Sequence, residues 1–271
     1  MCVKWIFRVI QALNIHLLYG QMMIKKKLYL FASSCFFVYA FNLAFAETKY
    51  ATKGAPEAAG KVLYQQYPAS ADGIGKVYLG REIAQVMGYQ GAAWLERESR
   101  EKEERTDILL RALNLKKGMV VADIGAGTGY LSRRMADSVG LQGTIYAVDV
   151  QSEMIGKLKN LSKKYPNIKP VLSTPSDIKL AANSLDMAIM VDVYHELEFP
   201  YEVAQSVWAA LKPNGKLVLV EYRAEDDKIP IKNIHKMTQA QVIKELSVLP
   251  FKLHNKITSL PWQHVIVFTK Q

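Results

Sequence analysis

Cysteine is almost absent from this sequence, since its 271 residues include only Cys2 and Cys35. Both precede residue 47, so the rest of the chain has no thiol for a disulfide, a cysteine metal site or a cysteine nucleophile. Internal repeats and low-complexity tracts are also missing. No Gly-Lys-Ser or Gly-Lys-Thr follows a glycine-rich loop, which excludes a P-loop nucleotide site.

Excess charge is also scarce outside the N-terminal segment. The formal net charge of the chain is +10, but five of its 35 basic residues lie in residues 1–46, which contain no acid. The remainder therefore carries +5. It shows no basic tract and no aromatic-rich acceptor loop, so we expect no nucleic-acid partner.

The N-terminal segment is typical of a secretory leader. Residues 25–46 combine three lysines, an apolar run and a small-x-small ending at Ala44-Phe45-Ala46, and cleavage there would leave Glu47 first. Translation from Met22 or Met23 would give a signal peptide of normal length. The alternative is an uncleaved inner-membrane anchor, because residues 28–46 number 19 and a span needs about 20. Either reading predicts an exported or periplasmic domain, since the positive charge precedes the apolar run.

Three segments follow from composition: the leader in residues 1–46, an N-terminal extension and helix in residues 47–105, and a domain in residues 106–271. Residues 47–91 contain many breakers, which predicts an irregular extension. Residues 94–113 predict one helix. Six acids and five bases alternate along it, which is typical of a solvated face rather than a binding surface.

The domain alternates between strand and helix patterns. Expected strands are 119–124, 144–150, 168–173, 185–193 and 216–222, and expected helices are 130–139, 152–164, 200–211 and 238–248. This alternation predicts an α/β fold with a doubly wound, mostly parallel sheet. Two last extended runs, 251–260 and 263–270, should pair antiparallel at one edge of the sheet.

The first strand leads into a glycine-rich loop with Gly125, Gly127 and Gly129. A dinucleotide loop needs glycines at relative positions 1, 3 and 6, whereas these fall at 1, 3 and 5. Asp123 precedes the loop, where its carboxylate would repel a pyrophosphate and attract a cationic ligand. The loop therefore favours a cationic, phosphate-free cofactor, although such turns also occur for packing alone.

Two more acids end the next strands. Asp149, 24 residues after Gly125, fits an acceptor for ribose hydroxyls. Asp177 could accept an adenine amino group, or it could merely cap a helix.

The ordered motifs VADIGAGTGYLS, AVDVQSEMI, SDIKL, VDVYHEL and LKPNGKLVLVEYR resemble those of class I S-adenosylmethionine-dependent methyltransferases, over about residues 106–271. The resemblance implies a Rossmann-like seven-stranded sheet with an antiparallel last strand, and S-adenosyl-L-methionine as cofactor. By the same resemblance, the methionine part would be surrounded by Asp123, Gly125, Ala126, Gly127 and Gly129, the ribose by Asp149 and Val150, and the adenine by Asp177 and Ile178. The segments YLGREIAQVMGYQGAAWLER and EYRAEDDKIPIKNIHKM resemble, more narrowly, bacterial methyltransferase-domain proteins with an export leader.

Candidate catalytic residues close the fourth strand. His195 is the candidate base for methyl transfer, with Asp192 and Glu196 beside it and Asp192 also near the cofactor. Alternatively, His195 only begins a helix whose dipole Glu196 complements. Candidate substrate residues are Tyr194, Tyr222, Arg223 and His235, with Lys232 and Lys236 nearby, although these charges could be ordinary surface groups.

We expect no metal, because no aspartate–asparagine pair follows the fifth strand. The function expected is methyl transfer to a small-molecule or lipid-like acceptor, with possible membrane association through residues 28–46. Export raises a difficulty, since S-adenosylmethionine is made in the cytosol. The alternative is therefore an exported, non-catalytic protein that keeps the fold and binds a small ligand.

Overall fold

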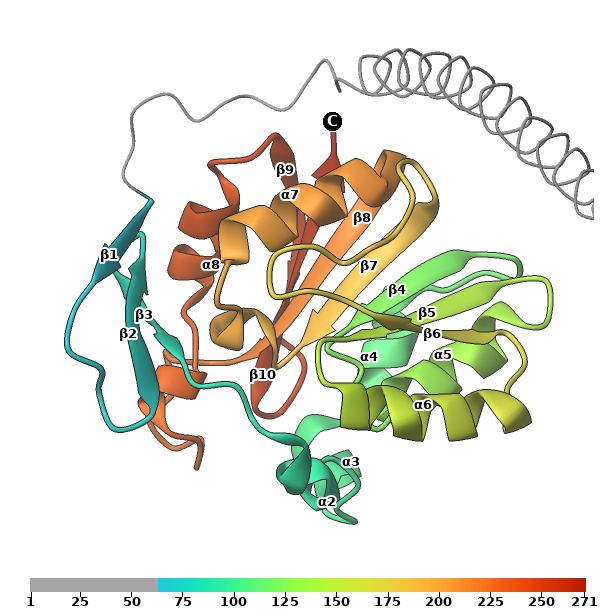
Figure 1. The fold of residues 1–271 in the computed structure, drawn as a ribbon, viewed down its shortest axis with the longest axis horizontal. Coiled ribbons are helices and arrows are strands. Elements are labelled where there is room, and N and C mark those ends of the chain that lie inside the picture. Colours follow the sequence, from blue (N-terminus) through green and yellow to red (C-terminus); the bar gives the residue numbers. More distant parts are fainter. Residues whose placement is uncertain (1–62) are drawn as a thin grey trace, which may run out of the picture. The chain divides into compact units, whose positions relative to one another are not determined.

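A computed structural model describes residues 63–271, so the leader predicted in residues 1–46 lies outside the described residues. Its main element is a seven-stranded sheet of order β6-β5-β4-β7-β8-β10-β9 (Figure 1). The strands are β4 (Val120–Ile124), β5 (Thr144–Asp149), β6 (Ile168–Leu172), β7 (Leu185–Val191), β8 (Leu211–Tyr222), β9 (Phe251–Ile257) and β10 (Gln263–Lys270). The first five are parallel, and β10 runs antiparallel to both β8 and β9. The doubly wound, mostly parallel sheet predicted from the sequence is confirmed.

Helices cover both faces of this sheet (Figure 1). They are α4 (Thr106–Leu113), α5 (Tyr130–Val139), α6 (Ser152–Lys164), α7 (Pro200–Ala210) and α8 (Gln239–Leu246). Alternate residues of one strand serve opposite faces: Val121 packs with α4, α5 and α6, while Ala122 belongs to the core on the side of α7 and α8. Because β4 pairs with both β5 and β7, strand order reverses at β4, and a ligand crevice is expected at the carboxyl ends of these strands.

Residues 64–84, predicted to be irregular, form a small antiparallel sheet instead. Its strands are β1 (Tyr64–Gln66), β2 (Gly73–Tyr78) and β3 (Arg81–Ala84). A tight turn joins β2 to β3, with Leu79 and Gly80 both at positive φ, as the favoured hairpin turn requires. Tyr78 and Ile83 are fully buried in the core on the side of α7 and α8. Burial against the larger sheet thus stabilises strands too short for the sequence pattern to reveal.

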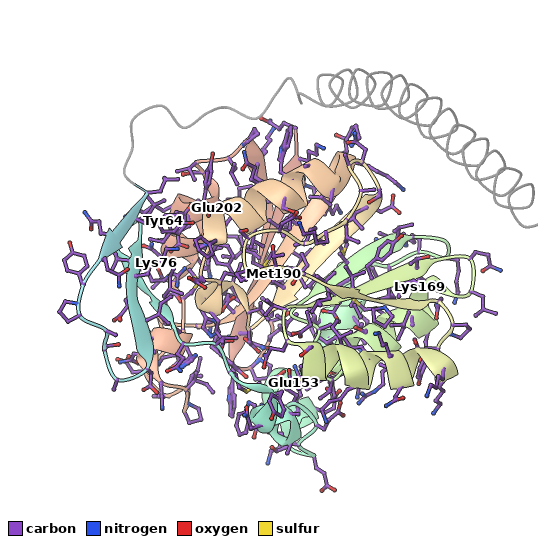
Figure 2. All side chains as sticks on the ribbon, viewed as in Figure 1. Tyr64, Lys76, Glu153, Lys169, Met190 and Glu202 are labelled. Atoms are coloured by element: carbon purple, nitrogen blue, oxygen red, sulfur yellow. The ribbon has the colours of Figure 1, made fainter. Side chains whose placement is uncertain are left out.

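The small sheet also contacts α7. Figure 2 shows Tyr64 and Lys76 near Glu202, and the Tyr64 hydroxyl donates to Glu202 Oε2 at 2.5 Å. Lys76 Nζ lies 3.4 Å from the centroid of the Phe199 ring. These contacts fix the small sheet against the end of the large sheet where the crevice is expected.

The single helix predicted over residues 94–113 is wrong. The segment consists of α2 (Ala92–Leu95), α3 (Arg100–Glu104) and α4, and Arg105 takes a left-handed conformation with φ 49°. The break turns Arg100 and Glu104 inward, where both are buried and ion-paired at 2.8 Å. Within residues 63–271, no helix combines the length and the apolar character needed to span a bilayer.

Candidate functional site

A cavity of about 710 Å³ lies at the carboxyl ends of β4, β5 and β7. Its volume is within the range of about 300–1,000 Å³ that is usual for small-ligand sites. One wall comes from the large sheet and its loops, including Ile124, Asp149 and Val191. The other comes from the N-terminal elements, including Ile74, Ala84 and Trp94. The cavity is therefore lined by both the N-terminal elements and the large sheet.

The glycine loop brings its backbone to the cavity wall and packs closely against neighbouring side chains. Gly125 and Gly127 line the cavity and have φ of 70° and 55°, which other residues rarely adopt. A Cβ at Gly125 would lie 2.5 Å from Val193, and one at Gly127 would lie 2.6 Å from Leu95. Gly129 instead packs against Leu161, and Ala126 is buried. Only the first two of the predicted glycines face the cavity.

Asp149 presents a buried carboxylate to the cavity. Its oxygens accept hydrogen bonds from the Gly127 and Gln151 amides, each at 2.9 Å. Burial raises the pKa of Asp149 above its ordinary value, although these amides oppose the shift. A carboxylate can accept about four hydrogen bonds, so two remain for ligand hydroxyl groups. Val150 lies beside Asp149 on the wall.

Two other predicted cofactor acids, Asp123 and Asp177, turn away from the cavity. Asp123 is buried behind the loop and accepts from the Ser132 hydroxyl at 2.5 Å, and burial raises its pKa to about 6. Asp177 accepts from the Ser206 hydroxyl at 2.9 Å and pairs with Lys179 at 2.7 Å. Its neighbour Ile178 does line the cavity. Of Asp123, Asp149 and Asp177, only Asp149 lines the cavity.

Asp192 faces the cavity from the end of β7 in an unusual conformation. Its φ is 55°, and such non-glycine residues in the left-handed region cluster at functional sites. Oδ2 accepts from the Gln263 amide at 2.7 Å, whereas buried Oδ1 has no hydrogen-bond partner within residues 63–271. Burial, with the carboxylates of Glu104 and Glu221 nearby, raises the pKa of Asp192 well above its ordinary value. This carboxyl group is suited to receive a proton.

His195 lies behind the cavity wall in the short helix η2 (Tyr194–Glu196). It is buried, with Nδ1 2.6 Å from Glu221 Oε2 and Nε2 3.2 Å from His235 Nδ1. Burial lowers its pKa, but the carboxylates of Glu221 and Glu196 outweigh that effect and raise the pKa to about 10. His195 thus lies away from the lining residues with both ring nitrogens facing other side chains, which is unfavourable for a base.

Its two neighbours in η2 differ in position. Glu196 lines the cavity, and its pKa falls to about 2 because the imidazoles of His195 and His235 outweigh burial. Tyr194 is fully buried, and its backbone amide donates to Glu221 Oε1 at 2.9 Å. Of this sequence motif, Glu196 therefore faces the cavity, whereas Tyr194 and His195 lie in the protein interior.

Among the candidate substrate residues, Tyr222 alone lines the cavity. Arg223 donates to the carbonyls of Leu260, Pro261 and Gln263, so it stabilises the turn before β10. His235 contacts His195 instead. Lys232 pairs with Asp72 at 2.6 Å, and Lys236 is buried.

The sequence missed an ionic cluster on the cavity wall. Arg97 and Arg100 both bind Glu104, at 2.7 and 2.8 Å, and the Tyr222 hydroxyl donates to Glu104 at 3.1 Å. All four line the cavity. The alternating charges of this segment indicated a solvated face, yet the same alternation lets opposite charges neutralise one another when buried.

These residues fit S-adenosyl-L-methionine. The backbone of Gly125 and Gly127 lines the cavity, Asp149 can accept from a ribose, and Ile178 offers an apolar surface to an adenine. The Glu196 carboxylate, whose pKa is lowered, supplies negative charge in the same cavity, which suits a cation.

Comparison with known proteins agrees with this fit. Residues 115–263 match the family model described as methyltransferase domain. An uncharacterised methyltransferase-like protein of Schizosaccharomyces pombe is 31% identical over 125 residues, 46% of each chain. A ubiquinone/menaquinone biosynthesis C-methyltransferase of Haemophilus ducreyi is 28% identical over 112 residues, 40% of this chain and 43% of that protein. The chain spans less than half the length of these curated relatives.

A solved structure shares the fold. The S-adenosylmethionine-dependent methyltransferase of Aquifex aeolicus superposes with a TM-score of 0.65 at 22% identity, over 69% of this chain and all of that one. The family model covers more than half of the sequence, and the strand order, glycine loop and cavity agree with it. The chain belongs to the methyltransferase-domain family of class I S-adenosyl-L-methionine-dependent methyltransferases.

Proposed function

We propose that this protein transfers a methyl group from S-adenosyl-L-methionine to a small-molecule or lipid-like acceptor. One observation carries the proposal. The glycine loop, Asp149 and Asp192 all line a single cavity. In the described residues, one buried oxygen of Asp192 has no hydrogen-bond partner. Cofactor and acceptor can therefore share one space, as an in-line displacement requires.

The walls favour an acceptor that is mostly apolar and uncharged. Ile74, Ala84 and Val86 form much of the N-terminal wall. Its arginines are already paired with Glu104, its Lys76 stacks on the Phe199 ring, and neither Lys232 nor Arg223 lines the cavity. The printed name of the Haemophilus ducreyi relative, a quinone-biosynthesis C-methyltransferase, supports a lipid-like acceptor.

We assign to Asp192 the removal of a proton from the acceptor. When bound, S-adenosyl-L-methionine supplies an electrophilic methyl group on a sulfonium. The acceptor must lose a proton from a hydroxyl or an acidic C–H, and within residues 63–271 Asp192 Oδ1 has no hydrogen-bond partner. His195, the base expected from the sequence, acts behind the wall by fixing Glu221, which holds the Tyr194 backbone two residues from Asp192.

Cofactor binding is tested by calorimetry of the full chain with S-adenosyl-L-methionine. We expect saturable binding, and Asp149→Ala should weaken it at least about tenfold, since a charged group loses its hydrogen bonds to the ligand. Asp177→Ala is the matched control, because the Asp177 carboxylate faces Ser206 and Lys179. The affinity of this variant for S-adenosyl-L-methionine should equal that of the wild type. Absence of binding, or an unchanged affinity in Asp149→Ala, would refute the assignment.

The role of Asp192 is tested by turnover with a short-chain hydroquinone and a lipid-soluble phenol as acceptors. Asp192→Asn should lower kcat by about 10²–10⁴ with cofactor affinity retained. Asp227→Asn, at an exposed acid outside the cavity, is the control. Full activity in Asp192→Asn would remove Asp192 from the reaction.

Export stays a prediction, since residues 1–46 lie outside the described residues. N-terminal sequencing of the native protein after cell fractionation would test it. A mature start at Glu47 in the periplasm supports a cleaved leader, and an intact N-terminus in the membrane fraction supports the anchor.

A further inference from the structure

Two histidines and a glutamate converge at the edge of the cavity. His195 and Glu196 come from η2, directly after β7, and His235 comes from the short helix η3 (Asn233–His235) after β8. His195 Nε2 lies 3.2 Å from His235 Nδ1 and 3.7 Å from Glu196 Oε1, and the latter two atoms are 3.5 Å apart. Three potential ligand atoms thus face one another in a nearly equilateral triangle.

The triangle has the size that a metal ion requires. Zinc binds imidazole nitrogen and carboxylate oxygen at about 2.0–2.2 Å in tetrahedral geometry, which separates neighbouring ligand atoms by roughly 3.4 Å. The three observed separations bracket that value. Two histidines and one carboxylate also form a known ligand set for catalytic zinc, in which a fourth position stays open.

The remaining polar atoms of the cluster are already bound in the way that metal sites require. His195 Nδ1 lies 2.6 Å from Glu221 Oε2, which fixes the ring and directs Nε2 toward the other ligands. Glu196 Oε2 accepts from the Met87 amide at 3.2 Å, which leaves Oε1 to face the two rings. Glu221 Oε1 is held by the Tyr194 amide.

Charge also favours a divalent cation. When a metal ion occupies His195 Nε2, that nitrogen carries no proton, so the ion faces two carboxylates, Glu196 and the fully buried Glu221. Arg81 donates to the His195 carbonyl, but its other two nitrogens bind Glu245 at 2.7 and 2.9 Å, so its charge is matched elsewhere. A divalent cation at this position therefore offsets the charge of one fully buried and one partly buried carboxylate.

We propose that His195 Nε2, His235 Nδ1 and Glu196 Oε1 bind one divalent transition-metal ion of the zinc type, oriented by Glu221. In the described part of the chain no fourth side chain joins the group, so water or an oxygen atom of a bound molecule completes the coordination. The ion links η3 to η2 and so fixes the segment after β8 against the cavity. Its binding requires neither S-adenosyl-L-methionine nor an acceptor.

The test uses the full chain without a polyhistidine tag, stripped with a chelator and titrated with zinc chloride by calorimetry. We expect one equivalent to bind at the cluster. His235→Ala should remove that equivalent or weaken it at least about a hundredfold, and Glu221→Gln should weaken it about 10–100-fold because it orients His195 without touching the ion. His254→Ala is the matched control, since His254 is an exposed residue of β9, and its titration should match that of the wild type.

The full chain also contains His16, Cys2 and Cys35, so zinc binding alone is not sufficient. An equivalent that survives in both His235→Ala and His235→Asn would overturn the proposal, as would no saturable binding by the wild type. The visible spectrum of the wild type loaded with cobalt(II) gives a second measurement that does not depend on whether a variant folds. Intense absorption supports a tetrahedral site with three nitrogen and oxygen ligands, and its absence contradicts such a site.

Discussion

Residues 106–271 and residues 63–105 contribute opposite walls of one cavity, yet their sequences differ in how much they reveal. In the first region, long apolar strands alternate with amphipathic helices, and almost every expected element is observed. In the second, short strands and a broken helix depend on contacts with the first region. The wall from residues 106–271 is therefore encoded locally, whereas the wall from residues 63–105 is encoded by packing between distant segments.

The largest expected effect concerns the ionic cluster of the second region. Arg100→Met should lower the free energy of unfolding by about 3–5 kcal/mol, because it leaves Glu104 buried with one cation fewer. Arg111→Met is the control, since Arg111 pairs with Asp107 on the surface, and its loss should cost less than about 1 kcal/mol. Urea unfolding of the two variants measures both values. Equal losses would mean that residues 92–105 are solvated after all.

A second comparison asks whether the small sheet is part of the same cooperative unit. Ile83→Ala in β3 and Ile145→Ala in β5 each remove a fully buried side chain, so each should cost about 2–5 kcal/mol. Thermal unfolding followed by circular dichroism measures the pair. If only Ile145→Ala lowered the midpoint, the small sheet would be an appendage rather than a wall.

The smallest expected effect concerns Asp123, a buried acid of residues 106–271. Because burial raises the folded-state pKa of Asp123 to about 6, its contribution to stability is complete below its ordinary pKa of 3.8 and is lost as pH rises through 6. Asp123→Asn should therefore match the wild type near pH 4 and exceed it by up to about 3 kcal/mol at pH 7.5.

The control for that experiment is Asp177→Asn. The pKa of Asp177 is lowered by Lys179 and Ser206 despite some burial, so its contribution is present above pH 3.8 and is lost as pH falls. The variant should thus be destabilised at pH 7.5. Denaturant unfolding across the pH range gives both curves, and a flat difference for Asp123→Asn would show that its carboxylate is not desolvated.

The sequence by itself determined the doubly wound sheet, the antiparallel pairing of the last two strands and the position of the glycine loop. Hydrophobic period and turn residues are local properties, so they can be read from neighbouring letters.

Tertiary structure alone decided which polar groups face the cavity. Asp123 and Asp149 both belong to strand ends, but one binds Ser132 and the other faces the ligand space. The ion pairs of Arg100, and the approach of His235 to His195 across 40 residues of sequence, depend on how separate segments pack. Hydrogen-bond partners and burial are set by contacts between residues far apart in the chain, and a pattern of neighbouring letters carries no record of them.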